Sequence, residues 1–339
     1  MSQDQISNKD TVFEFNSPSI KYENSFFVLS SGSTTPGFNK IIQHDFVLFL
    51  NKHKVVPRKF NKTFGFSPVD SIAGFEVLAE CLVGGKTLVL PLEKNTPTTV
   101  ARDLKLHNVD YFQTTPSFLA FVSSHEQWQE SNLPSLKHIA FGSEPISDRV
   151  LEKIQMRFPN VLLRQTYGMS EVGILKTRED TIDPNYFVLN EQNPGRITNG
   201  VLEVQSMTKL RSYVNRDNDS NNRLWFSTGD LAEETPHGLK VFGREGDIFN
   251  VGGRKFMPYE LEEKLLELPG VLKVHISKRV NTLVGDAIIA VFFLDEGLDE
   301  KIFFDNYKSF TQTLPDFMRP HSVKIAPFSS LGERFKGNL

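Results

Sequence analysis

The sequence predicts an α/β protein in which a large domain with mostly parallel sheets covered by helices is followed by a smaller α+β domain. Apolar strand-like runs alternate with amphipathic helix-like runs through Leu210. A complete strand–helix–strand unit lies between Leu136 and Gly168. Beyond Arg244 the pattern changes to glycine-rich turns, one helix and two long strands. We therefore expect a large domain over residues 1–243 and a small domain over residues 244–339.

The first unit begins with the apolar run Phe26–Leu29, which predicts a short strand. The small-residue stretch Ser31–Gly37 follows and predicts a loop. After Gln43, apolar residues recur at helical spacing, which predicts a helix; they are Phe46, Phe49 and Leu50. The order strand, loop, helix places the loop at the carboxyl end of a strand.

The second unit is a βαβ unit. Leu136–Gly142 predicts a strand, Ser147 is a suitable N-cap for the helix that follows, and Val161–Gly168 predicts the next strand. Strands joined in this way are parallel, so the turns Gly142–Pro145 and Tyr167–Glu171 should share one edge of the sheet. Open α/β sheets bind ligands at that edge.

In the expected small domain, prolines mark where the predicted helix begins and ends. Pro258 begins a helix that Pro269 ends, with a leucine stripe between them. The runs 271–280 and 286–294 predict two antiparallel strands. In the large domain, the Asn/Asp-rich stretch Tyr213–Arg223 predicts an exposed loop.

Composition excludes several classes of protein. The chain of 339 residues has 38 Lys and Arg against 41 Asp and Glu, a formal charge of −3, so it lacks the basic excess of a nucleic-acid or anionic-membrane binder. The single cysteine, Cys81, excludes an intrachain disulfide framework, and its apolar surroundings predict a core position. The longest apolar run, near 77–92, is interrupted by charges and glycines and is no membrane span. The polar amino terminus lacks a signal core, so we expect a cytoplasmic protein.

Six short motifs follow one another along the chain. They are SSGSTTPG (Ser30–Gly37), GSEPIS (Gly142–Ser147), YGMSE (Tyr167–Glu171), STGD (Ser227–Asp230), GREGD (Gly243–Asp247) and NVGGRKFMPYELE (Asn250–Glu262). In order and approximate spacing the series resembles the adenylate-forming superfamily of acyl-CoA ligases, carrier-protein-loading adenylation domains and firefly-type luciferases. The resemblance covers Ser30 to Glu262.

The resemblance implies a role for each matching residue. A loop that holds the β- and γ-phosphates of ATP is matched by Ser31, Gly32, Ser33 and Thr34. The adenine pocket is matched by Gly142, Ser143, Glu144, Tyr167 and Gly168, with Tyr167 as the stacking ring. Ser170 matches a hydroxyl near the α-phosphate, and Glu171 matches a carboxylate that holds Mg²⁺. Asp230 matches an acid that binds the ribose, and Arg244 matches a basic residue near the same sugar. A loop that lines a thiol tunnel is matched by Gly252 and Gly253.

These residue types suit the implied chemistry. A carboxylate is a natural oxygen ligand for Mg²⁺, which bridges phosphates and keeps waters. A carboxylate also accepts two hydroxyl hydrogens at once, as a ribose diol requires. When a substrate carboxylate attacks the α-phosphorus, metal and positioned donors offset the repulsion between two anions.

Structural alternatives exist for three of these residues. Glu171 could be an acid at a helix N-terminus, where it would act only on the helix dipole. Asp230 could be an ordinary turn residue, and Tyr167 could be core. His44 follows the phosphate loop at a position typical of the family, and no role is assigned to it.

The chain departs from the family in length. Only 29 residues precede Ser30, whereas members of the family have a large additional portion there. Apolar surface left uncovered by that difference favours association, so we expect a homo-oligomer or a complementary chain.

The chain departs from the family at two lysines and at the hinge. Phe38 stands where the family has its loop lysine, with Lys40 as a possible substitute or a plain surface residue. Glu333 stands where the family has its carboxyl-terminal catalytic lysine, and Lys336 could take over that role. Gly246 replaces the usual hinge Asp or Lys and permits the dihedral changes of a domain rotation.

The resemblance implies ATP-dependent activation of a carboxylic acid as acyl-AMP, with Mg²⁺, followed by transfer to a pantetheine thiol of an acyl carrier protein or CoA. The alternative is a non-catalytic, partner-dependent subunit of the same fold that binds nucleotide or carrier protein. The segments expected to line the pocket for the substrate acid, 69–82 and 113–118, do not identify that acid. Asp70 is out of register with the acid that holds an amino group in amino-acid-loading domains.

Overall fold

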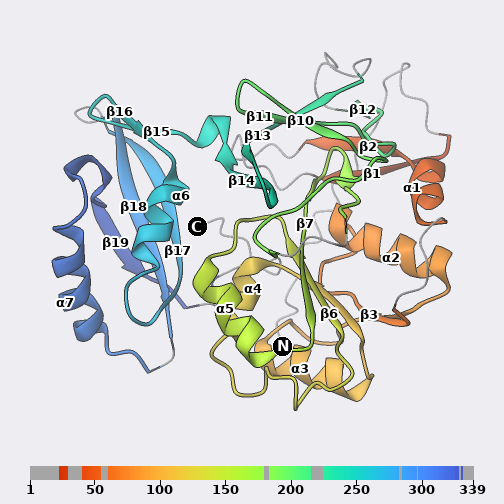
Figure 1. Ribbon diagram of the computed structural model, residues 1–339, viewed down its shortest axis with the longest axis horizontal. Helices are drawn as coiled ribbons and strands as arrows, with labels where there is room; N and C mark the ends of the chain where they lie inside the picture. The colour runs from red at the N-terminus through yellow and green to blue at the C-terminus, as the bar shows by residue number, and fades with distance from the viewer. Residues whose placement is uncertain are drawn as a thin grey trace, which may run out of the picture.

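The structure is a computed structural model that describes residues 23–29, 40–54, 60–178, 183–214, 224–281, 285–295, 297–327 and 330. The predicted phosphate loop, Phe38, most of the predicted 213–223 loop and the tail with Glu333 and Lys336 lie outside these residues. In Figure 1 a parallel sheet stands beside the carboxyl-terminal sheet.

The central sheet has five strands in the order β4-β3-β5-β6-β7, all parallel. Its strands are β3 (Lys62–Phe64), β4 (Thr87–Val89), β5 (Tyr111–Thr114), β6 (His138–Gly142) and β7 (Leu162–Thr166). The helices that connect or cover them are α2 (Ile72–Gly84), α3 (Pro97–Leu106), α4 (Pro116–Val122) and α5 (Asp148–Arg157). The predicted α/β class and the predicted β6-α5-β7 unit are confirmed, because β6 and β7 are adjacent and parallel.

Hydroxyl caps fix where these helices begin. The side chains of Ser71, Thr96, Thr115 and Ser147 each accept a hydrogen bond from the backbone N–H three residues further on. Each cap satisfies one of the backbone donors that a helix N-terminus leaves without a partner. The N-cap predicted at Ser147 is therefore confirmed.

The amino-terminal unit differs from the prediction. A strand, β2 (Ile41–Asp45), stands between the predicted loop and the helix α1 (Phe46–His53). It pairs antiparallel with β1 (Ser25–Leu29) on one side and with β12 (Ser212–Tyr213) on the other. The loop therefore connects two antiparallel strands, and Tyr213 belongs to a sheet instead of opening a loop. The sequence did not predict this strand because Gln43 and His44 are polar. Both side chains are buried and form hydrogen bonds inside the protein, which a hydropathy pattern does not detect.

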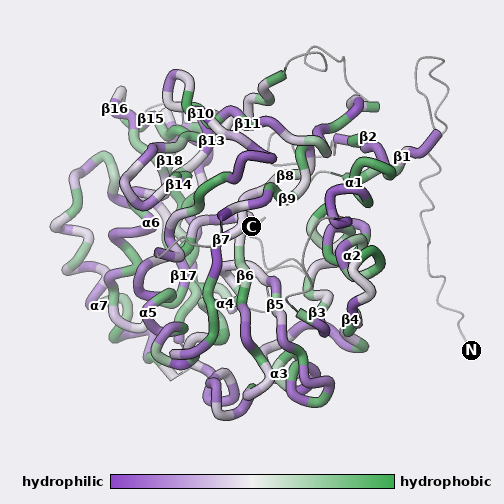
Figure 2. The backbone as a smooth tube through the Cα atoms, turned by 45° about the vertical axis from the view of Figure 1, so that its right-hand side comes forward, coloured by the Kyte–Doolittle hydropathy of each residue, from purple (hydrophilic) through white to green (hydrophobic). Residues whose placement is uncertain are grey.

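Helices α1 and α2 lie side by side below that sheet in both views (Figures 1 and 2). Phe49 of α1 is fully buried, whereas Phe46, Val47 and Leu48 are exposed. Cys81 of α2 is buried, as predicted. Most of α2 is drawn in the green of hydrophobic residues in Figure 2. Its Leu82 is exposed.

A second antiparallel sheet contains two of the predicted site residues, Asp230 and Arg244. Its strand order is β10-β11-β13-β14. The strands are β10 (Gly195–Thr198), β11 (Val201–Val204), β13 (Phe226–Thr235) and β14 (Gly238–Arg244). In the β13–β14 pair Asp230 lies opposite Arg244, which places an acid and a base side by side.

The residues after Arg244 form a sheet of their own, in the order β16-β15-β18-β17 with β19 beside β18. Its elements are η1 (Glu245–Asp247), β15 (Phe249–Val251), β16 (Arg254–Phe256), α6 (Pro258–Leu265), β17 (Val271–Asn281), β18 (Gly285–Leu294), α7 (Glu300–Thr311), η2 (Asp316–Met318) and β19 (Ser322–Ile325). The predicted helix at Pro258 and the predicted antiparallel pair β17–β18 are both present. A cluster of apolar residues confined to this part of the chain packs between its helices and sheet.

The carboxyl-terminal sheet also shares an apolar core with helices of the central sheet. Leu272, Val291 and Phe293 are buried in the same apolar cluster as residues of α3, α4 and α5. Figure 1 shows α4 and α5 on the side of the central sheet that faces β17. Within the described part of the chain, no helix is long and apolar enough to cross a bilayer.

Candidate active site

Two turns lie at the carboxyl edge of the central sheet, as the sequence predicted. Gly142 ends β6 directly opposite Thr166, which ends β7. A Cβ atom on Gly142 would overlap the Thr166 carbonyl oxygen, so only glycine permits this approach. The next residue, Ser143, has a φ of 78°, a conformation that non-glycine residues rarely adopt. The turn after β6 is therefore held tightly against the end of β7.

Tyr167, Asp230 and Arg244 form one hydrogen-bonded group at this edge. The Tyr167 hydroxyl donates to Asp230 Oδ2 at 2.6 Å, and Arg244 Nε donates to Asp230 Oδ1 at 2.9 Å. The Tyr167 ring stacks on the ring of Phe187, with centroids 4.9 Å apart and planes 3° apart. Asp230 is buried within strand β13, so the alternative of an ordinary turn residue does not apply.

The charge of Asp230 is incompletely stabilised. Burial raises the pKa of this carboxyl above its usual value, and the nearby Arg244 and the Tyr167 hydroxyl offset only part of that effect. Burial beside the same carboxylate also raises the pKa of Tyr167, so its hydroxyl stays a hydrogen-bond donor at neutral pH. Each oxygen of Asp230 retains a lone pair that a ligand donor can use.

Glu171 lies in the tight turn between β8 (Gly168–Met169) and β9 (Gly173–Ile174). It is not at a helix N-terminus, so the helix-dipole alternative does not apply. Lys40 Nζ lies 3.3 Å from Glu171 Oε1, and the hydroxyl of Tyr213 donates to the same oxygen at 3.2 Å. Glu171 also acts electrostatically on Arg244. The structure thus places Lys40, three residues after the predicted phosphate loop, beside Glu171, in the turn that follows Tyr167.

His44 supports the turn that carries Ser170 and Glu171. The ring is fully buried, with Nε2 2.7 Å from the Ser170 carbonyl oxygen and Nδ1 3.1 Å from that of Thr208. Burial lowers the pKa of this imidazole, although both carbonyls act in the opposite direction. The residue to which the sequence assigned no role therefore anchors the main chain next to a predicted site residue.

Glu144 is placed differently from the rest of its motif. Its Oε1 accepts hydrogen bonds from the backbone N–H and the hydroxyl of Ser117, and its Oε2 lies 2.8 Å from Lys273 Nζ. The side chain therefore joins β17 of the carboxyl-terminal sheet to the start of α4, while the main chain of the motif stays at the sheet edge.

The sequence of residues 16–197 matches the family model described as "AMP-binding enzyme". That match covers more than half of the chain. The chain belongs to the AMP-binding enzyme family.

Two curated members illustrate the range of relatives. Bacitracin synthase 3 of Bacillus licheniformis is 23% identical over 92% of this chain and 6% of its own length. The D-alanine–D-alanyl carrier protein ligase of Listeria monocytogenes is 27% identical over 46% of this chain and 32% of its own length. The chain therefore spans only a minor part of these AMP-binding relatives.

A solved member of this fold is the anthranilate CoA ligase AuaEII in complex with anthranoyl-AMP. It superposes with a TM-score of 0.76 at 18% identity, over 92% of this chain and 65% of that one. At this identity the likeness concerns the fold. The adenylate-forming architecture expected from the motifs is thus confirmed for the described residues, and about a third of the solved relative has no counterpart here.

The residues of this AMP-binding chain fit a magnesium ion that is shared with phosphates. Within the described part of the chain, no group of three or more His, Cys, Asp or Glu side chains is arranged to hold a metal ion. Glu171 instead offers a single, nearly buried carboxylate. One carboxylate is enough for Mg²⁺ when phosphates and waters complete an octahedral shell.

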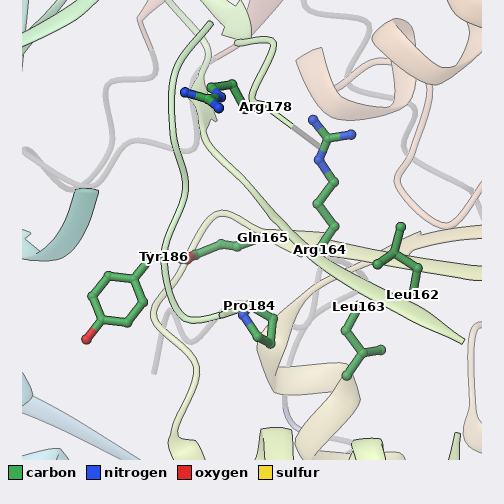
Figure 3. A pocket seen from close by; sticks show the side chains of 7 residues that line it. All are labelled: Leu162, Leu163, Arg164, Gln165, Arg178, Pro184 and Tyr186. Atoms are coloured by element: carbon green, nitrogen blue, oxygen red, sulfur yellow. The ribbon is translucent and has the colours of Figure 1, made fainter. Parts of the chain in front are cut away.

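Two cavities of the AMP-binding fold lie outside this group of residues. Figure 3 shows the first, lined by Gln165 and Arg164 of β7 and by Tyr186; at about 10 Å³ it holds at most one water. The second, of about 200 Å³, is lined by Lys52, Lys176 and Thr208 among others. Neither cavity is lined by Tyr167, Asp230 or Glu171.

Several residues of the site carry no signal in the sequence. Tyr213 stands at the start of a polar stretch, Phe187 follows Tyr186 in a segment without a motif, and Lys273 is one of two lysines in its strand. Gln165 does carry a signal in the sequence, because it lies two residues before Tyr167, whose ring is predicted to stack on adenine. Its Oε1 is buried and makes no hydrogen bond to the described residues, which leaves an acceptor at the sheet edge.

Proposed function

We propose that the chain activates a carboxylic acid with ATP, forming an acyl-AMP and pyrophosphate, and then transfers the acyl group to a pantetheine thiol of CoA or an acyl carrier protein. The observation that carries the proposal is the hydrogen-bonded group of Tyr167, Asp230 and Arg244 at the carboxyl edge of the central sheet, with Glu171 in the turn that follows Tyr167. This edge is where open α/β sheets bind ligands.

The nucleoside would lie between the two turns of that edge. Asp230 would accept hydrogen bonds from the ribose hydroxyls, which relieves the unfavourable burial of its charge. Arg244 would stay beside the same sugar. Gln165, with a buried acceptor oxygen at the end of β7, is suited to the exocyclic amine of adenine. The ring of Tyr167, supported from behind by Phe187, would pack on the base.

The triphosphate would lie toward Glu171 and Lys40. Glu171 would hold Mg²⁺, which when bound neutralises phosphate charge and orients the leaving pyrophosphate. Lys40 brings a positive charge to within 3.3 Å of Glu171, so it would offset part of the repulsion between that carboxylate and a phosphate. Ser170 presents a hydroxyl in the same turn, where we propose contact with the α-phosphate. The expected contributions of Ser31, Gly32, Ser33, Thr34 and Lys336 stay predictions from the sequence.

The reaction has two balanced steps. A substrate carboxylate oxygen attacks the α-phosphorus, the bond between the α-phosphorus and the oxygen bridging to the β-phosphorus breaks, and pyrophosphate leaves. A thiolate then attacks the acyl carbon and AMP leaves with the oxygen. Gly252 and Gly253 form the exposed turn between β15 and β16, and we propose that this turn lines the thiol path.

ATP–pyrophosphate exchange tests the proposal. We expect exchange in the presence of Mg²⁺ with at least one acid from a panel of amino, aryl and fatty acids. Glu171→Ala should lower the exchange rate by about 10²–10³-fold, because it removes the carboxylate that we propose holds the metal. Glu191→Ala, at an exposed position, is the matched control. Absence of exchange with every acid, from a folded protein, would contradict the proposal.

A partner-dependent, non-catalytic subunit is the second candidate. It is favoured by two residues of the sequence: Phe38 and Glu333 stand where the family has lysines. Calorimetry with ATP separates the candidates. Tight ATP binding without exchange, for the protein alone, would favour the non-catalytic candidate, whereas exchange by the protein alone would rule it out.

A further inference from the structure

A polar cluster connects the two domains beside the turn after β6. Lys273 Nζ, from β17, lies 2.8 Å from Glu144 Oε2 and 2.5 Å from Ser117 Oγ. Ser117 in turn donates its backbone N–H to Glu144 Oε1 at 2.9 Å. The side chains of Lys273 and Glu144 are only 17% and 18% exposed, and Ser117 is buried. The three residues therefore form a largely desolvated contact and not a surface ion pair.

The surroundings of this cluster are apolar. Leu272, the neighbour of Lys273, is buried among residues of α4 and α5, as are Val291 and Phe293. Other polar contacts between the same two parts of the chain lie elsewhere: Ser124 Oγ donates to Asp295 Oδ2 at 3.1 Å. The Lys273 contact differs from that hydrogen bond because its acceptor belongs to the turn at the sheet edge.

Glu144 ties that turn to the start of α4 and to β17. Gly142 is pressed against β7, and Ser143 holds a φ of 78°, so the main chain there is not in a relaxed conformation. Glu144 directly follows Ser143, the strained residue, and its carboxylate is held by Ser117 and Lys273. Burial alone would favour its neutral form, but the charge and hydrogen bond of Lys273 and the donors of Ser117 lower its pKa, so the carboxylate stays ionised. Without Lys273 the buried carboxylate would lose its counter-charge and seek solvent.

We propose that Lys273 is a positioning residue: from the carboxyl-terminal sheet it holds Glu144, and through Glu144 it keeps the Gly142–Glu144 turn in the shape that receives the nucleotide. This rests on the proposed function in one respect, that the turn lines the nucleotide pocket. The docking of the small domain and the nucleotide affinity of the large domain are thereby linked through one side chain.

The link is tested first without any ligand. Lys273→Met removes the charge and keeps the aliphatic length, whereas Ser124→Ala removes a hydrogen bond between the same two parts of the chain at a distance from the turn. We expect amide hydrogen exchange in peptides covering residues 140–147 to become faster in Lys273→Met than in the wild-type protein and to be unchanged in Ser124→Ala. Equal exchange in all three proteins would overturn the proposal.

Nucleotide binding supplies the second readout. We expect Lys273→Met to weaken ATP binding in calorimetry and to raise the KM for ATP in exchange by about tenfold, a usual size for coupling between sites. The KM for the acid should stay unchanged, and Lys273→Arg should restore most of the ATP affinity. A merely structural contact would lower activity through loss of folded protein and would leave both KM values alone, which would contradict the proposal.

A third variant keeps the test decisive if the unpaired Glu144 unfolds the single variant. Glu144→Gln combined with Lys273→Met removes both charges and should fold, and it should loosen the turn as much as Lys273→Met does, because the two residues act as one unit. An unaltered turn in the folded double variant would overturn the proposal. If the wild-type protein binds no ATP, the proposed function fails, while hydrogen exchange still decides whether Lys273 controls the turn.

Discussion

Two buried carboxylates, Glu76 and Asp230, differ in how fully their charge is compensated. Glu76 of α2 accepts from Lys52 at 2.5 Å, from the backbone N–H of Ile174 at 2.9 Å, and lies 2.9 Å from His53 Nε2. Burial opposes its ionisation, but the charge of Lys52 and the contact with His53 lower the pKa of Glu76 to about 2. Asp230 also faces a cation, yet its pKa is raised.

The difference separates a structural carboxylate from one poised for a ligand. Glu76 has every oxygen engaged by groups that are themselves buried, so its ionised form is stable within the protein alone. The partner of Asp230, Arg244, has a side chain that is 40% exposed, and solvent weakens its effect. A folded protein keeps an incompletely compensated buried charge most readily where binding completes the compensation.

Substitution of Glu76 should have the largest effect on stability. Glu76→Gln leaves Lys52 and His53 beside a neutral side chain, and breaking a buried ion pair from one side costs about 3–5 kcal/mol. The pKa of Glu76 is lowered on folding, so its contribution is present above its ordinary value of 4.5 and is lost as the pH falls toward 2. Chemical denaturation should therefore show a large deficit at pH 7 that narrows in acid. Glu80→Gln, at a more exposed ion pair, is the control.

Substitution of Asp230 should act on binding instead. Asp230→Asn keeps the shape, removes the charge and makes one oxygen a donor group, which cannot accept from a ribose hydroxyl. We expect ATP affinity to fall by about 10–100-fold, as for the loss of a charged hydrogen-bonding group worth about 1.5–3 kcal/mol, with stability nearly unchanged. Calorimetry checks the affinity, and Glu234→Gln, exposed on the same strand, is the control. Unaltered ATP affinity would contradict the claim that Asp230, in contrast to Glu76, serves to bind a ligand.

Glu262 of α6 is a third carboxylate, whose pKa is raised as that of Asp230 is. One oxygen accepts from the backbone N–H of Ile276 at 2.8 Å, and burial raises its pKa to about 7. A pKa raised on folding means that the stabilising effect of protonation is present below about 4.5 and is lost as the pH rises through about 7. Glu262→Gln keeps the acceptor for Ile276, so it should be about 1–2 kcal/mol more stable than the wild-type protein at pH 8 and equal to it at pH 4.5. A difference independent of pH would contradict this account.

Lys40 should have the smallest effect. Its ammonium group is a quarter exposed and shares Glu171 with the Tyr213 hydroxyl. Exposed charge pairs contribute about 0–1 kcal/mol, so we expect Lys40→Ala to change the exchange rate by no more than about fivefold. A loss as large as that of Glu171→Ala would show that Lys40 contacts the reacting phosphates directly.

The sequence predicts those parts of the molecule in which local pattern and tertiary role agree. The β6-α5-β7 unit has apolar strands, a Ser147 cap and a proline stop, and it folds as predicted. Strand β2 was missed because Gln43 and His44 are buried through hydrogen bonds, which hydropathy does not register. Lys273 was missed because its partners, Glu144 and Ser117, are more than a hundred residues away, and no local rule brings them together.

A crystal structure of the protein with Mg²⁺ and a non-hydrolysable ATP analogue tests the central claim most directly. We expect the analogue at the carboxyl edge of the central sheet, with its ribose hydroxyls within hydrogen-bonding distance of Asp230 and its phosphates toward Glu171. An unliganded edge at saturating analogue, with Asp230 still engaged only by Tyr167 and Arg244, would contradict the claim that this incompletely compensated carboxylate marks a nucleotide site.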